Sequence, residues 1–111
     1  MGNLLGPPVS ERVIAEIIAE RRRQIVCEGF SHEHDDLHAS GEIAAAAGCY
    51  ALQAAGCELR GRDIGRFWPW SASCWKPKDQ RQDLIRAAAL LVAELERIDR
   101  AASNSDPPQS E

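Results

Sequence analysis

Three stretches of the chain repeat apolar residues at helical spacing, and they predict three principal helices. The first runs from Glu11 to about Val26, with Ser10 as its N-terminal cap and Gly29 as its end. Glu16, Glu20 and the arginines lie mostly apart from its apolar positions, which predicts an amphipathic helix. Those apolar positions are Val13, Ile14, Ile17, Ile18, Ile25 and Val26.

The second predicted helix runs from Glu42 to about Ala55, with Ser40 as its cap and Gly56 as its end. One stripe of this helix consists mostly of small residues, namely Ile43, Ala46, Ala47, Tyr50, Ala51 and Ala54. Because small side chains let a neighbouring helix approach closely, we expect this helix to lie centrally and to pack on at least one partner.

The third helix has the clearest pattern. Asp79, with Gln82 three residues later, resembles a capping box, and the helix runs from there to about Ala102. Its apolar residues alternate steps of four and three, which is the spacing of a seam between helices; they are Leu84, Ala88, Leu91, Leu95, Ile98 and Ala102. Such a seam packs against a helix of the same chain or against a second copy, and we expect a homodimer.

The segments around these helices set the domain organisation. Residues 1–9 contain glycines and prolines and predict a flexible lead, and residues 103–111 predict a disordered tail. Residues 57–77 predict a long loop that contains all three tryptophans. The sequence therefore predicts one all-α domain over residues 10–102, with three main helices and a Trp-rich loop between the second and the third.

Composition narrows the classes of partner. With 111 residues, 44% of them hydrophobic and 27% charged, the chain is typical of a single small globular domain. Its formal net charge of −4 provides no field that attracts a polyanion, so we do not expect nonspecific nucleic-acid binding. We interpret the arginines at 21–23 and at 60–66 as solvated surface.

The cysteines and the N-terminal sequence bear on the cellular compartment. The four cysteines, Cys27, Cys49, Cys57 and Cys74, include no CxxC pair, so we expect free thiols. The N-terminus lacks the pattern of a signal peptide, and no apolar run is long enough to cross a bilayer. We expect a cytoplasmic protein that does not bind membranes.

Acidic side chains in the second quarter of the chain suggest a cation site. Asp35, Asp36 and Glu42 would repel one another, and a divalent cation such as Mg²⁺ would relieve that repulsion. Alternatively, these acids are solvated and favour the N-terminus of the following helix. Glu94 lies beside the apolar stripe of the third helix, where a carboxylate is unusual. It either meets Glu42 and completes the cation site, or pairs with an arginine such as Arg97 or Arg86.

Other side chains are candidates for binding an organic ligand. Trp68, Trp70 and Trp75 either stack on a nucleobase or attach the long loop to the core, and the two roles are compatible. His34 and His38 are four residues apart and would share a face if their segment is helical, a geometry that can also bind a transition metal. Together with Arg86, these residues are the predicted ligand-binding set.

The order of several motifs resembles a family of small phage and prophage proteins. These motifs are Glu33-His34-Asp35-Asp36, Gly41-Glu42-Ile43-Ala44, Trp68-Pro69-Trp70, Lys76-Pro77 and Asp83-Leu84-Ile85. The resemblance covers about residues 20–100. It implies a mobile-element origin and hence the cytoplasm of a bacterial host. Ser71 stands where an Asp often follows the Trp-Pro-Trp element.

Residues 37–44 resemble the Gly-Glu-Leu-Ala element of MazG-like all-α nucleotide pyrophosphohydrolases. Acids precede that element in the family, where this sequence has His38, Ala39 and Ser40. The resemblance implies Mg²⁺ held by Asp35, Asp36, Glu42 and Glu94, with Glu42 and Glu94 as catalytic residues. The alternative hypothesis is a non-catalytic binding protein that blocks a host defence protein or sequesters a nucleotide signal.

Overall fold

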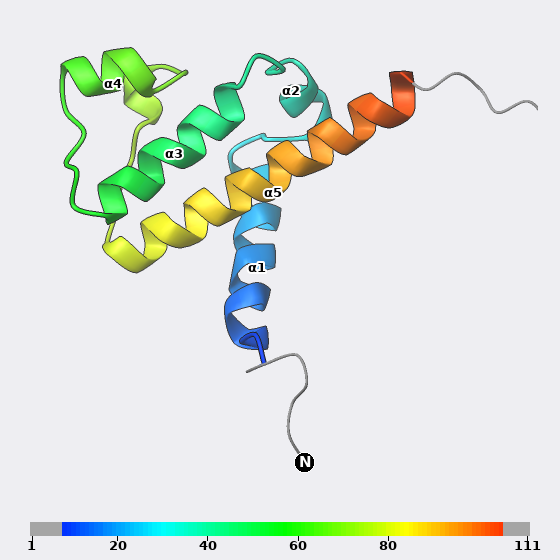
Figure 1. Cartoon of the computed structure of the whole chain (residues 1–111), viewed down its shortest axis with the longest axis horizontal. Helices are drawn as coiled ribbons and strands as arrows, with labels where there is room; N and C mark the ends of the chain where they lie inside the picture. The colour runs from blue at the N-terminus through cyan, green and yellow to red at the C-terminus, as the bar shows by residue number, and fades with distance from the viewer. Residues whose placement is uncertain (1–7, 106–111) are drawn as a thin grey trace, which may run out of the picture.

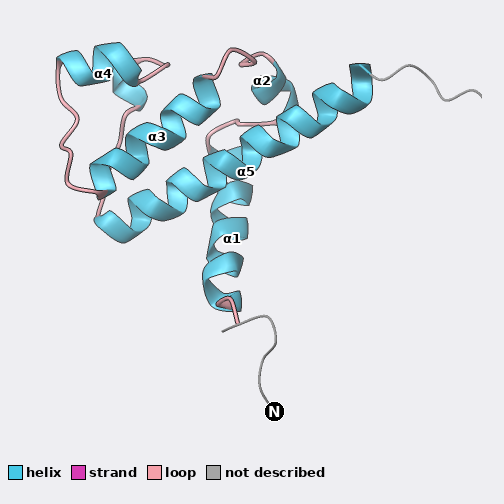
Figure 2. Ribbon diagram, in the orientation of Figure 1, coloured by secondary structure: helices cyan, strands magenta, loops and turns pink. Residues whose placement is uncertain are grey.

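A computed structural model describes residues 8–105, which form helices and contain no strand (Figures 1 and 2). In chain order the elements are α1 (Glu11–Cys27), α2 (His32–Asp36), α3 (Glu42–Ala54), α4 (Arg62–Phe67), the 3₁₀ turn η1 (Ala72–Cys74) and α5 (Gln80–Ser105). The predicted all-α class is confirmed. Across the described residues, each helix is too short or too polar to span a bilayer.

Local capping chemistry sets the ends of the main helices. The hydroxyl of Ser10 accepts a hydrogen bond from the Val13 N–H, and the Asp79 carboxylate accepts one from the Gln82 N–H at 2.8 Å. Gly29 and Gly56 follow α1 and α3 with φ of +74° and +95°, a conformation that glycine adopts without steric cost. The three predicted helices are therefore confirmed.

The predicted cap of α3 is wrong. Gly41, and not Ser40, occupies the N-cap position, with φ of +91° and no side chain to donate or accept. The Glu42 carboxylate instead accepts a hydrogen bond from the Ser40 N–H at 2.6 Å. The turn before α3 needs a left-handed residue, and that requirement outweighs the preference for a serine cap.

Two predicted boundaries also differ from the structure. The segment 57–77 is not only loop, because it contains α4 and η1. Helix α5 continues to Ser105, so the first residues of the predicted disordered tail are helical. The remainder of that tail and residues 1–7 of the predicted flexible lead lie outside the described residues.

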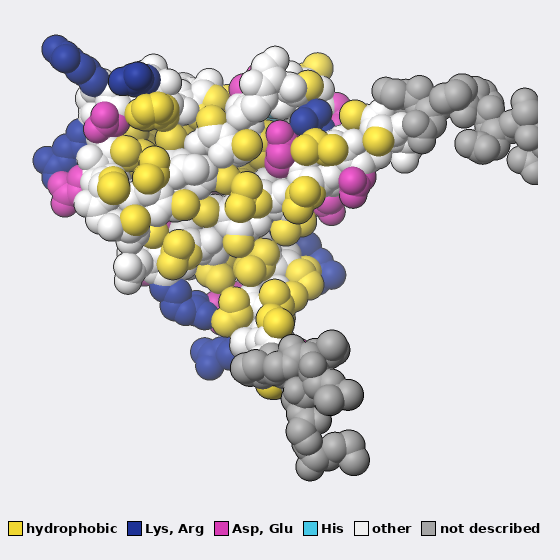
Figure 3. All heavy atoms as spheres, in the orientation of Figure 1, with side chains coloured by type: hydrophobic (Ala, Val, Ile, Leu, Met, Phe, Trp, Pro, Cys, Tyr) yellow, Lys and Arg dark blue, Asp and Glu magenta, His cyan; other side chains and the backbone are white. Residues whose placement is uncertain are grey.

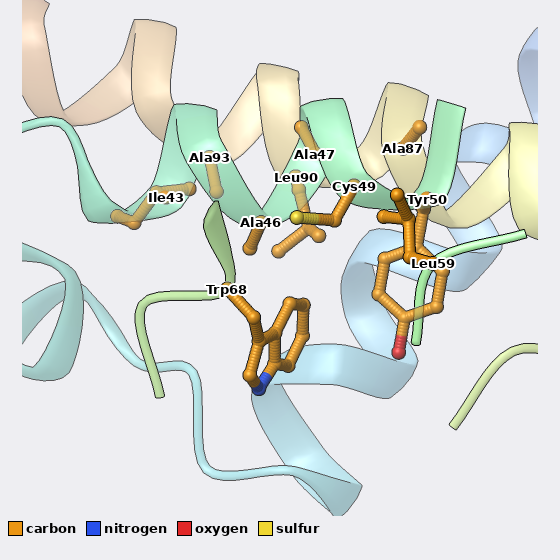
Figure 4. Packing of buried hydrophobic residues seen from close by; sticks show 10 residues of the cluster. All are labelled: Ile43, Ala46, Ala47, Cys49, Tyr50, Leu59, Trp68, Ala87, Leu90 and Ala93. Carbon is orange, nitrogen blue, oxygen red and sulfur yellow. The ribbon is translucent and has the colours of Figure 1, made fainter. Parts of the chain in front are cut away.

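The apolar core lies between α3, α5 and the segment that joins them. Helix α3 runs beside α5 in the opposite direction (Figure 1), and these two helices share the most extensive contact in the structure. The predicted stripe of small residues on α3 faces the core, and Trp68 packs beneath α3 (Figure 4). The core residues are Ile43, Ala46, Ala47, Cys49, Tyr50, Leu59, Trp68, Ala87, Leu90 and Ala93. The expected central position of α3 is confirmed.

Helix α1 packs on the rest of the molecule through polar side chains. Glu20, Arg21 and Gln24 are its buried residues. Its apolar side chains Val13, Ile14, Ile18 and Val26 are exposed instead. Ile17 and Ile25 are half-buried, so the apolar stripe of α1 is only partly covered, and polar side chains make its most buried contacts with the rest of the molecule.

Arg21 accounts for this orientation of α1. Its guanidinium donates to the Asp35 carboxylate of α2 at 2.9 Å, to Glu96 of α5 at 3.2 Å and to the carbonyl oxygen of Phe30 at 3.1 Å. Arg21 and Asp35 are both almost fully buried. The interpretation of residues 21–23 as solvated surface is therefore wrong for Arg21, because one buried carboxylate needs its charge.

The predicted seam of α5 does not pack within the chain. Leu84, Leu91, Leu95 and Ile98 are between 46% and 61% exposed. The buried face of α5 uses a different set of positions, which includes Asp83, Ala87, Leu90 and Ala93. The intramolecular alternative for the seam is therefore wrong.

The buried ion pair between Arg21 and Asp35 leads to a prediction about stability. Asp35→Ala leaves the Arg21 charge without its buried partner and should lower the free energy of unfolding by about 3 kcal/mol. Asp36→Ala is the matched control, since Asp36 is the adjacent residue and is exposed. Urea denaturation followed by circular dichroism measures both. Equal losses in the two variants would contradict the role given to Arg21.

Candidate functional site

The three tryptophans fold the segment 57–77 onto α3. The Trp68 indole N–H donates to the Ser71 carbonyl oxygen at 2.9 Å, and the ring meets Tyr50 edge-on at 5.7 Å between centroids. Trp75 lies against Tyr50 at 4.8 Å. Trp68 is 7% exposed, whereas Trp70 and Trp75 are half-buried. The predicted role of attaching the loop to the core is confirmed for Trp68.

A pocket of about 110 Å³ opens beside this cluster. Four aromatic rings and two opposite charges surround it, from the α1–α2 turn, from α3 and from the segment 57–77. The lining residues are Glu28, Phe30, Tyr50, Cys74, Lys76, Trp68 and Trp70. Sequence reasoning identified the two tryptophans but missed Phe30, Tyr50, Glu28 and Lys76, because only the fold brings these segments together.

Trp70 is the central side chain of the site. Its ring lies 5.4 Å from Phe30 and 5.7 Å from His38, measured between centroids. The indole N–H of Trp70 is buried and has no hydrogen-bond partner among the described residues. A buried donor without a partner is costly, so an acceptor on a ligand or a water that reached this N–H would stabilise it.

A second and wider pocket of about 420 Å³ lies on the α4 side. It shares Trp68 and Trp70 with the first pocket, and its other lining residues are Gly61, Ile64, Gly65, Ala72 and Trp75. The predicted tryptophans therefore line two pockets, which share Trp68 and Trp70, while Trp75 lines the second. Flat aromatic walls of this kind stack on planar rings.

The two histidines support Trp70 and do not line either pocket. His34 and His38 lie one turn apart on and after α2, with ring centroids 4.4 Å apart. Nδ1 of His34 is 3.0 Å from the Asp35 carboxylate, and Nδ1 of His38 is 2.8 Å from the His34 carbonyl oxygen. The centroids of both rings lie within 6.0 Å of the Trp70 ring, so the two histidines pack against the indole and help to position it.

Arg86 fixes the backbone at the rim of the first pocket. Its guanidinium donates to the Lys76 carbonyl oxygen at 2.6 Å and lies 5.7 Å above the Tyr50 ring. The Lys76 N–H donates in turn to the Tyr50 hydroxyl. Burial raises the pKa of Tyr50, so this hydroxyl stays protonated at neutral pH. Arg86 therefore positions the lining residues Lys76 and Tyr50 without lining the pocket itself.

Each of the four predicted metal ligands already has donors. Asp35 accepts from Arg21, and Asp36 accepts from Arg100 at 2.8 Å. Glu94 receives two hydrogen bonds from Arg97, at 2.6 and 3.2 Å, so its predicted arginine pairing is confirmed with Arg97 rather than Arg86. Asp35 is neither solvated nor a member of an acidic cluster, since its partner is a buried arginine.

Arg97 interacts electrostatically with the other three predicted ligands, Asp36, Glu42 and Glu94. The hydrogen bond from Arg100, with further help from Arg97, lowers the pKa of Asp36. The N–H groups of Glu42 and Ser40, again with help from Arg97, lower the pKa of Glu42. Glu94 in turn raises the pKa of Arg97, and Asp36 and Glu42 add to that effect. Acids from α2, α3 and α5 thus all act electrostatically on one arginine, and Glu94 contacts it directly.

This arrangement does not fit a divalent cation. Among residues 8–105 no group of three or more His, Cys, Asp or Glu side chains is placed to hold a metal ion. A guanidinium already neutralises the acids that were predicted to bind Mg²⁺, and a second cation beside it would be repelled. Magnesium binding by Asp35, Asp36, Glu42 and Glu94 therefore has no support from the geometry.

The four cysteines do not form a redox or metal site either. All four are free thiols, as expected, and Cys49 is the buried one. Burial raises the pKa of the Cys49 thiol, which keeps it protonated. Cys74 is the only one of the four that lines the aromatic pocket.

The position of Arg97 generates a prediction about pH. Arg97 helps to lower the pKa values of Asp36 and Glu42 below their ordinary 3.8 and 4.5, so its stabilisation is fully present above those values. It is lost as the pH falls through the lowered values. Arg97→Ala also removes the ion pair with Glu94, so it should lower the Tm at neutral pH and lower it less near about pH 3, where the carboxylates are protonated. Calorimetry at both pH values measures this, and a deficit that does not depend on pH would contradict it.

Comparison with models of protein families, with characterised proteins and with solved structures found no match to this chain. The two family resemblances inferred from its motifs therefore stay predictions. The site itself is an aromatic pocket with one acidic and one basic side chain at its rim, beside acids that arginines neutralise.

Proposed function

We propose that this protein binds a nucleotide without hydrolysing it and so sequesters a nucleotide signal. The observation that carries the proposal is the pocket between Phe30, Tyr50, Trp68 and Trp70. Aromatic faces hold nucleobases by stacking, and each stacked base contributes about 1–3 kcal/mol. A prophage origin, which the motif order suggests, would make a signal of the bacterial host the natural ligand.

The polar groups at the pocket match the other parts of a nucleotide. Lys76 supplies a positive charge for a phosphate at the rim, and the Glu28 carboxylate can accept from an exocyclic amino group of a base. The unpartnered N–H of Trp70 can donate to a ring nitrogen or a carbonyl oxygen. The ligand class is therefore a purine or cytosine nucleotide rather than a purely apolar molecule.

The compartment and the oligomeric state are also part of the proposed function. We place its action in the bacterial cytoplasm, where free thiols persist. We also propose that it is a homodimer through the α5 seam, because that seam is exposed along its length in the single chain. A partner of the host defence machinery is the alternative to a nucleotide signal, and the binding experiment below separates the two.

Nucleotide hydrolysis remains a second candidate on one observation. Asp36, Glu42 and Glu94 come from three helices, and each of them raises the pKa of Arg97. Their charges are neutralised by arginine, which favours a structural role. Incubation with a panel of nucleoside triphosphates and MgCl₂ tests this candidate by pyrophosphate release. Release that Glu94→Gln abolishes would replace the binding proposal with the hydrolase.

The binding proposal predicts the effect of two substitutions. Trp70→Ala removes one stacking wall and should weaken binding of a nucleotide roughly 5- to 150-fold. Lys76→Glu reverses an exposed charge and should weaken binding of the nucleotide much more than that of the matching nucleoside. Isothermal titration with mono- and cyclic dinucleotides measures both, and chromatography of the recovered ligand checks that it is unchanged.

Two matched controls lie nearby in the chain. Phe67 is an aromatic residue that is 47% exposed and lines neither pocket, so Phe67→Ala should bind normally. Lys78→Glu carries the same charge reversal as Lys76→Glu, two residues away and outside both pockets. Equal losses in the controls, or no binding by any nucleotide in the panel, would contradict the proposal.

A further inference from the structure

The broad face shown in Figure 3 is apolar in its middle and charged mainly along its edges. Exposed side chains of three helices contribute to it. The exposed large apolar residues of α5 are Leu84, Leu91, Val92, Leu95 and Ile98, which share one side of that helix by their spacing, and those of α1 include Val13, Ile14 and Ile18. This composition, with charge depleted at the centre and present at the rim, is typical of a protein interface.

Helix α3 contributes a row of small residues to the same surface. Ala44, Gly48 and Ala55 are exposed at helical spacing, and Leu52 lies among them. This row is on the side of α3 opposite to Ala46 and Tyr50, which face the core. A Cβ atom placed on Gly48 would meet no neighbouring segment within 4 Å, so packing within residues 8–105 does not require a glycine there.

We infer that a second copy of this chain covers this face, with the leucine row of α5 in each copy lying over the small-residue row of α3 in the other. This inference rests on the homodimer proposed above and adds the surfaces that meet. The leucine row of α5 projects from the surface, and the small-residue row of α3 lies lower. A two-fold axis would therefore place the leucine row of each copy on the small-residue row of the other. The result would be a bundle of four helices, two from each copy.

The size of the face supports this occupant. The stretch from Leu84 to Ala102 is about 27 Å long, and α3 beside it makes the surface about 20 Å wide. That gives roughly 500 Å², and the exposed side of α1 adds roughly 250 Å². The sum is near the ~800 Å² per partner of a standard stable interface.

The angle between α1 and α5 extends the same surface. A cleft of about 220 Å³ lies there, with Ile17, Ile18 and Val92 among its lining residues. Packing against a second copy would fill it with apolar side chains. A membrane is a poorer occupant, because the net charge is −4 and anionic lipid would be repelled.

The first test is the oligomeric state of the full chain by sedimentation velocity, with Leu95→Glu as the main variant. Leu95 is 61% exposed, so its replacement should leave helicity and Tm near those of the separate chain while it shifts the dimer dissociation constant at least tenfold. Val26→Glu is the matched control. Val26 is 81% exposed in the last turn of α1, which passes behind α5 in Figure 1, and its replacement should leave the dimer intact.

Gly48→Leu tests the pairing of rows more sharply. A Cβ at this position has free space among the described residues, Gly48 is exposed, and leucine raises helix propensity, so the fold should be retained. It would fill the shallow row and should separate the copies as strongly as Leu95→Glu. A dimer that Leu95→Glu separates and Gly48→Leu does not would overturn the pairing of α5 with α3.

The remaining outcomes are also decisive. A wild-type dimer that neither variant separates would overturn both the inferred face and the α5 seam as the dimer contact. A wild-type monomer at high concentration would overturn both. A monomer that floats with phosphatidylglycerol vesicles would assign the face to a membrane. Leu95→Glu should still bind nucleotide, because the aromatic pocket is on the other side of α3 and Leu95 does not line it. Nucleotide titration of this variant therefore tests the binding proposal independently of the dimer.

Discussion

The structure depends on one buried guanidinium. Arg21 of α1 donates to the Asp35 carboxylate of α2, to Glu96 of α5 and to the Phe30 carbonyl oxygen, so a single side chain joins three helices and the turn between two of them. A buried charge is tolerated only where its partners satisfy it, which makes these contacts mutually dependent. Phe30, placed by this contact, is one wall of the aromatic pocket, and His34 beside Asp35 positions Trp70. The ion pair between Arg21 and Asp35 therefore positions residues of the pocket although neither of its members lines the pocket.

The same ion pair explains why the apolar side of α1 faces outward. Glu20, Arg21 and Gln24 occupy the face that meets the other helices, and Glu20 holds Arg23 and approaches Arg86. Burial raises the pKa of Glu20, but Arg23 and Arg86 outweigh that effect and lower it, so the carboxylate stays charged. Because polar side chains make the most buried contacts of α1, much of its apolar stripe stays exposed beside the exposed leucines of α5. An exposed apolar surface of this size is typical of a site that packs against another molecule.

Periodicity and caps predicted the three long helices because those features are local. Ser10, Asp79, Gly29 and Gly56 act on backbone groups within a few residues, so their effect does not depend on the fold. The short helices α2 and α4 escaped prediction since five or six residues hold a helix only when other parts of the molecule support them. The acids were misjudged for a related reason. Carboxylates close in sequence suggested a shared cation, but arginines 14 to 64 residues away reach them first.

The two faces of α3 divide the molecule into two sites that do not compete. Ala46 and Tyr50 face the tryptophans and the pocket, while Ala44 and Gly48 lie on the opposite side. Alanine and glycine at these positions leave room on both sides of the helix, for the indole of Trp68 on one and for another helix on the other. A larger residue on the inner row would displace Trp68 and with it the wall shared by the two pockets. On the outer row, a Cβ added to Gly48 would meet no neighbouring segment within 4 Å among the described residues, so packing within them does not require the glycine, and a second copy packed against α3 would account for it.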